Sequence, residues 1–119
     1  MLFELLCGAL LLCVRSTVAI VSGDFDRVVM IGDIHGSYNG LTDILYASGV
    51  TTSPNSCLWV PQDKPLLLVQ TGDIVDRGPG AVEAFDCLQH LQQNAASNNA
   101  KVVRLLGSKK KCSDNYVYC

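Results

Sequence analysis

The chain has 119 residues, and 9 Lys and Arg stand against 11 Asp and Glu, which gives a formal net charge of -2 and a pI near 5.5. This balance excludes the strongly basic surface of a general nucleic-acid binder, so we expect no nucleic-acid partner. Apolar residues make up 49% of the chain, which is enough for the core of one small domain.

A short apolar run, residues 5–14, opens the chain and is ended by Arg15. It is shorter than the roughly 18 residues that cross a bilayer, so we expect no stable membrane span. Small or modest side chains stand at the -3 and -1 positions of a cleavage site after Ala19, which predicts a signal peptide over residues 1–19 and a secretory-pathway or extracellular protein. Glu4 and the lack of an early Lys or Arg leave two alternatives, a mis-assigned start and a buried N-terminal helix.

The chain has six cysteines, of which four remain if the leader is cleaved: Cys57, Cys87, Cys112 and Cys119. None has the CxxC spacing of a zinc site. They could pair in an oxidising compartment, or Cys87 could be a small core residue on a helix. The sequence leaves the pairing open.

The first predicted unit is a buried strand at residues 27–31 (RVVMI), followed by a helix. Ser37 or Asn39 can cap this helix, and Gly49 can supply the left-handed residue after it. The face expected to be apolar consists of Leu41, Ile44, Leu45 and Ser48.

A loop at residues 51–65 separates this unit from a second buried strand at residues 65–71. A second helix is expected from Pro79, which suits a first helical turn, to about Asn94. His90 falls on its polar side and is expected to be solvated. The apolar stripe of this helix consists of Val82, Phe85, Leu88 and Leu91.

A third short strand at residues 101–106 completes a strand, helix, strand, helix, strand order. The order predicts an α/β fold of right-handed βαβ units with a parallel sheet. Such sheets place ligands outside the carboxyl ends of their strands. The first two strands end in the sequences GDIHG and GDIVDRG, which contain Asp33, His35, Asp73, Asp76 and Arg77.

These residue types suit a metal site that acts on phosphate. Asp33 and His35 are two positions apart, so an extended backbone aims a carboxylate and an imidazole at one ion. Asp73 arrives from the neighbouring strand and could bridge two ions, the usual device for activating water against a phosphate ester. Taken singly, each aspartate could be a turn or cap residue, and Arg77 could form a surface ion pair.

Together, GDIHG and GDIVDRG resemble the first two signature motifs of the phosphoprotein-phosphatase family of calcineurin-like metallophosphoesterases. The resemblance covers about residues 27–107, and the 51–65 insertion is most similar to the bacterial-like (Shewanella-like) branch. It implies the N-terminal half of a metallophosphoesterase β-sandwich flanked by helices. It also implies two divalent metal ions (Mn, Fe or Zn), with Asp33 and His35 on the first and Asp73 bridging both.

The same resemblance assigns two further roles. Arg77 would grip phosphate oxygens through its planar guanidinium. Asp76 would orient the catalytic histidine of a third motif, Gly-Asn-His-Glu. In this sequence Gly107 is followed by Ser108 and then by three lysines, residues 109–111, so the Asn ligand and the general-acid histidine of that motif are absent.

The departure predicts that the chain holds at most one ion and is inactive as it stands. Residues 108–119 are interpreted as an aberrant tail, such as a frameshift, retained intron or alternative exon produces, or as the end of a natural short isoform. Three hypotheses follow. The chain is part of a phosphatase that hydrolyses phosphomonoesters, chiefly phosphoserine or phosphothreonine; or a non-catalytic phosphate- or metal-binding fragment; or a gene-model artefact without function.

Overall fold

The computed structural model describes residues 23–105, so the predicted leader (1–19) and tail (108–119) lie outside the described residues. The elements, in chain order, are β1 (Arg27–Ile31), α2 (Tyr38–Ala47), β2 (Leu66–Gln70), α3 (Ala81–Gln93), the 3-10 turn η1 (Ala96–Asn98) and β3 (Ala100–Arg104). The three strands form a parallel sheet in the order β1-β2-β3, which confirms the predicted α/β fold. None of the helices within residues 23–105 has the length and apolar character needed to cross a membrane.

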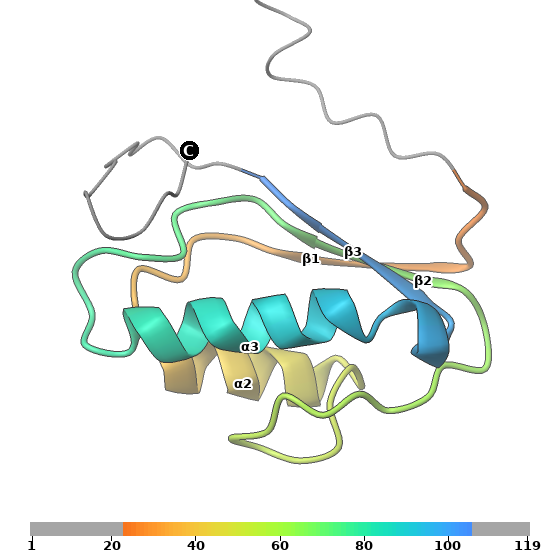
Figure 1. Ribbon diagram of the computed structural model, residues 1–119, viewed down its shortest axis with the longest axis horizontal. Helices are drawn as coiled ribbons and strands as arrows, with labels where there is room; N and C mark the ends of the chain where they lie inside the picture. Colours follow the sequence, from red (N-terminus) through yellow and green to blue (C-terminus); the bar gives the residue numbers. More distant parts are fainter. Residues whose placement is uncertain (1–22, 106–119) are drawn as a thin grey trace, which may run out of the picture.

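Both helices cover the same face of the sheet (Figure 1). On this face Ile31, Leu66 and Leu68 are buried against the helices. No helix within residues 23–105 lies over the opposite face, where Val28 and Met30 are 53% and 67% exposed. The prediction that the first strand is buried is therefore wrong for one of its two faces. A parallel strand is buried on both sides only where helices or a second sheet cover both sides.

Helix α2 begins as expected. Ser37 is its N-cap and accepts a hydrogen bond from the Gly40 N–H at 3.3 Å, and Gly49 has the left-handed φ of 70°. The predicted apolar face is partly wrong, because Ile44 is 46% exposed. The helix instead buries Leu41, Thr42 and Leu45, and the Ser48 N–H caps the last turn.

Helix α3 buries Ala84, Cys87, Leu88 and Leu91, which follow the three- and four-residue spacing of one helical face. Val82 was predicted on this face and is 58% exposed. It is two positions from Ala84, which is about 200° around a helix of 3.6 residues per turn. His90 is exposed, as expected.

The predicted loop at residues 51–65 is confirmed, and it packs on α3. Thr51 and Trp59 form an isolated antiparallel bridge within it. Trp59 is buried, and its indole N–H donates a 2.8 Å hydrogen bond to the Leu91 carbonyl of α3. A disulfide joins Cys57 of the loop to Cys87 of α3, a pairing that the sequence had left open.

Candidate metal centre

Two acidic loops lie side by side at the carboxyl ends of β1 and β2. We call residues 32–36 the first acidic loop and residues 72–78 the second acidic loop. Backbone hydrogen bonds join them, because the His35 N–H donates to the Asp73 carbonyl at 2.8 Å and the Gly78 N–H donates to the His35 carbonyl at 2.8 Å. The position of each loop therefore depends on the other.

A side chain that the sequence reasoning missed, Gln70, ties both loops to the sheet. Gln70 is fully buried at the end of β2. Its amide nitrogen donates to the carbonyls of Gly32 at 3.2 Å and Gly72 at 2.6 Å, and its amide oxygen accepts from the Gly72 N–H at 2.8 Å. The available signal was a single polar residue at the end of an apolar strand, since such a residue must be hydrogen-bonded when buried.

Four of the five candidate site residues have the left-handed backbone conformation. Their φ angles are 47° at His35, 50° at Asp73, 89° at Asp76 and 69° at Arg77. Such conformations cost about 1–3 kcal/mol each for residues other than glycine and cluster at functional sites. The rest of the fold therefore stabilises four strained residues at this end of the sheet, and their backbone conformations set the directions of their side chains.

Three of the candidate residues come together as a possible metal site. Asp33, His35 and Asp73 each offer a ligand atom, and these atoms lie within 4.8 Å of one another. The His35 Nε2 atom is 3.4 Å from the Asp33 carboxylate. The His35 Nδ1 atom is buried and has no hydrogen-bond partner among residues 23–105. Carboxylates and imidazoles are common ligands of divalent metal ions, so the donor set fits one such ion.

Asp76 and Arg77 lie in the second acidic loop, outside the three-residue group. The Asp76 carboxylate accepts a 2.9 Å hydrogen bond from the Arg77 N–H, which fixes the turn between them. The Arg77 side chain is exposed. The roles given to these two residues stay predictions.

Comparison with known proteins decides the family. The family model described as calcineurin-like phosphoesterase matches residues 26–117. The chain belongs to the calcineurin-like phosphoesterase family. Its three-stranded parallel sheet with flanking helices is consistent with the N-terminal part of the metallophosphoesterase fold, as expected.

Two relatives show how much of the length of other calcineurin-like phosphoesterases this chain covers. It is 41% identical over 81 residues to an uncharacterized protein of Schizosaccharomyces pombe. The aligned residues make up 68% of this chain and 24% of the relative. It is 33% identical over 82 residues to Shewanella-like protein phosphatase 1 of Plasmodium berghei, with 69% and 22% covered. The chain thus spans about a quarter of the length of these relatives. No solved structure shows significant similarity to it.

Proposed function

We propose that this chain provides half of a dinuclear phosphatase centre, namely the first metal site and the phosphate-binding arginine of a serine/threonine protein phosphatase. One observation supports the proposal most directly: ligand atoms of Asp33, His35 and Asp73, from two loops, lie within 4.8 Å of one another. The similarity to Shewanella-like protein phosphatase 1 supports a phosphoprotein substrate.

Each residue has a distinct task in this proposal. When bound, divalent ions would supply an activated water and neutralise the charge of the phosphate. Asp33 and His35 would hold the first ion, and Asp73 would bridge it to the second. The exposed Arg77 guanidinium would bind two phosphate oxygens with paired N–H donors, which orients the ester. Asp76 would orient the general-acid histidine of a third motif.

We propose further that the chain alone turns over little substrate. Residues 108–111 stand where the family pattern has its Asn ligand and catalytic histidine, and three of them are lysines. Loss of a positioned general acid alone costs roughly 10²–10⁴-fold in rate. A chain with one ion and an exposed arginine can still bind metal and phosphate, so a non-catalytic binding role is the second candidate.

Calorimetric titration of the full chain with Mn²⁺ tests the metal assignment. We expect one equivalent to bind weakly, and Asp73→Ala to remove that binding. Asp43→Ala is the matched control, because Asp43 is an exposed carboxylate on α2 outside the ligand group. Equal Mn²⁺ binding by Asp73→Ala and the parent chain would contradict the assignment.

A separate assay tests turnover. With Mn²⁺ present, the chain is expected to hydrolyse an aryl phosphate at the background rate. If it turns over well above background and loses that activity on Arg77→Ala, the centre is complete within these 119 residues and the half-site proposal fails.

We propose the secretory pathway or the extracellular space as the location. The Cys57–Cys87 disulfide supports this, because disulfides persist mainly in oxidising compartments. N-terminal sequencing of the protein expressed in a eukaryotic secretion system tests it. A secreted product that begins at residue 20 is expected, whereas a cytosolic product that begins at Met1 would reject the location.

A further inference from the structure

The Cys57–Cys87 disulfide links the 51–65 loop to helix α3. The two cysteines are 30 positions apart in the chain, and the bond crosses from the 51–65 loop to the middle of α3. The Trp59 hydrogen bond to the Leu91 carbonyl fastens the same loop one helical turn further along α3. Together, the disulfide and this hydrogen bond hold the loop against the helix.

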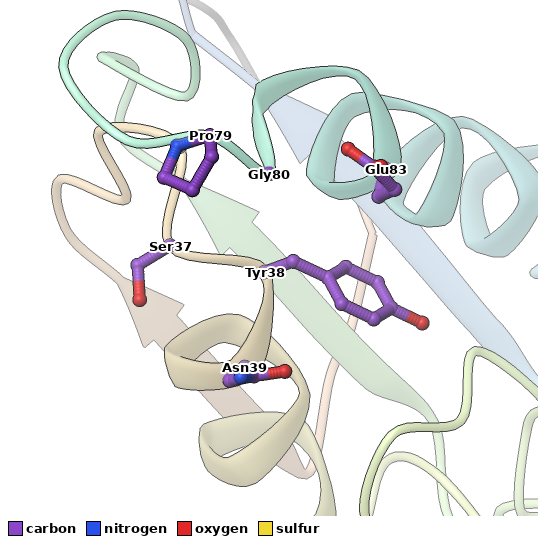
Figure 2. A pocket seen from close by; sticks show the side chains of 7 residues that line it. Ser37, Tyr38, Asn39, Pro79, Gly80 and Glu83 are labelled. Atoms are coloured by element: carbon purple, nitrogen blue, oxygen red, sulfur yellow. The ribbon is translucent and has the colours of Figure 1, made fainter.

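The disulfide also contacts the first residue of α2, which follows the first acidic loop in the chain. The Tyr38 hydroxyl lies 3.7 Å from the Cys57 sulfur, and Tyr38 is the first residue of α2, three positions after His35. Tyr38 and Glu83 both line a pocket of about 390 Å³ between the starts of α2 and α3 (Figure 2). Two other residues that line this pocket are joined by a hydrogen bond, because the Gly80 N–H donates to the Gly36 carbonyl at 2.9 Å.

The two cysteine residues differ in their exposure to solvent. Cys87 is 4% exposed in the core, whereas Cys57 is half-buried and packs against that core from the loop. A thiolate from solution can therefore attack the Cys57 sulfur, and the Cys87 sulfur leaves with the electron pair of the broken bond and takes up a proton. A second thiol of the same reductant then releases Cys57. The protein gains two thiols, and the dithiol reductant becomes a disulfide.

We propose that the Cys57–Cys87 disulfide is a redox-controlled link. When it is oxidised, it holds the 51–65 loop and Tyr38 against α3 and stabilises the first metal site. When a dithiol reduces it, the loop and Tyr38 are released from α3. The physical basis is that a disulfide removes conformational freedom from the unfolded chain, which matters most in a small domain. The metal effect rests on the metal centre proposed above. The pairing and the stability effect do not.

The first experiment maps the disulfides of the full chain by mass spectrometry of a non-reduced digest. A cross-linked peptide containing Cys57 and Cys87 is expected as the main product, and it should disappear after treatment with a dithiol. Free thiols at both positions, or main pairing of either one with Cys112 or Cys119, would overturn the proposal. This measurement also decides the matter if the cysteine variants do not fold.

The second experiment compares the thermal unfolding of the parent chain and of Cys57→Ser, each with and without a dithiol. Loss of the disulfide is expected to lower the midpoint by about 10 °C or more, and the reductant should have no further effect on Cys57→Ser. The matched control is the double variant Cys112→Ser, Cys119→Ser, which should melt as the parent does and respond to reductant. A Cys57→Ser midpoint within about 2 °C of the parent, well below the expected shift, would refute the link.

The third experiment titrates Mn²⁺ into the parent and into Cys57→Ser without reductant. We expect the Mn²⁺ affinity of Cys57→Ser to fall by about tenfold or more, as it does when groups that orient metal ligands are removed. Equal affinities would show that the link acts on stability alone and would overturn its coupling to the metal site. If the parent has the mapped disulfide and the melting shift but binds no Mn²⁺, the proposed function fails, and the stability part of the link stands.

Discussion

The helix-covered face of the sheet and the two acidic loops are built on opposite principles. The core between this face and the helices contains fully buried leucines, such as Leu45 of α2 and Leu88 of α3. The loops place His35 and Asp73 in left-handed backbone conformations and leave the Asp33 side chain 57% exposed. Packing of the core stabilises the fold, whereas the left-handed conformations in the loops cost folding free energy. We therefore expect substitutions in the two regions to have different effects on stability and on metal binding.

The largest effect is expected where the two loops touch. An added Cβ at Gly36 would lie 2.4 Å from the Gly78 carbonyl oxygen, and Gly36 has a φ of 73°. Backbone strain and overpacking cost about 1–3 kcal/mol each, so Gly36→Ala should lower the free energy of unfolding by about 2–6 kcal/mol and abolish Mn²⁺ binding. Denaturant unfolding and calorimetry measure the two losses.

Gly32→Ala is the matched control for that substitution. Gly32 belongs to the same motif, but an added Cβ there would meet no atom of the described residues within 4 Å. If both alanine variants behave alike, close contact between the loops is not what makes Gly36 necessary.

A core substitution should lower stability while leaving the loops intact. Leu45→Ala removes a fully buried side chain from α2, at an expected cost of about 2–5 kcal/mol. Variant chains that remain folded should bind Mn²⁺ as the parent does. Ile44→Ala, one position away and 46% exposed, should change the unfolding free energy by no more than about 0.5 kcal/mol; a similar loss in both variants would contradict the buried face described for α2.

Gln70 stands between the two regions and should show both effects. Gln70→Leu leaves the Gly32 and Gly72 carbonyls and the Gly72 N–H without their partner. An unsatisfied buried group costs about 1–3 kcal/mol, so we expect a stability loss of that order together with weaker Mn²⁺ binding. The control is Gln89→Leu on the exposed side of α3. Unchanged Mn²⁺ affinity in Gln70→Leu would show that Gln70 does not position the loops.

The smallest expected effect concerns two buried threonines. The Thr51 hydroxyl is buried and has no hydrogen-bond partner in the part of the chain that the structure describes. Thr51→Val should therefore raise the free energy of unfolding by up to about 1 kcal/mol. The Thr42 hydroxyl donates to the Asn39 carbonyl at 3.1 Å. Thr42→Val should therefore lower the free energy of unfolding by about the same amount. Opposite signs in denaturant unfolding are the expected result; a loss in both would show that Thr51 has a partner.

The sequence predicted the order of elements and the approach of Asp33, His35 and Asp73 to one another because both depend on local patterns. Apolar runs mark the strands, and the acidic motifs directly after them reach the same edge of a parallel sheet. Ile44 and Val82 were misplaced because an apolar residue next to a helical stripe looks like part of it in sequence. Gln70 and the disulfide depend on contacts between distant segments, and periodicity carries no information on these.

The burial of Trp59 gives this molecule a built-in optical probe. It is the single tryptophan of the chain, it is 7% exposed, and its indole N–H is bonded to α3. An indole shielded from water emits at shorter wavelength than a solvated one, so the emission spectrum reports whether the 51–65 loop lies on the helix. Far-ultraviolet circular dichroism reports α2 and α3 themselves. Release of the loop and melting of the helices can therefore be followed as separate events in one unlabelled sample.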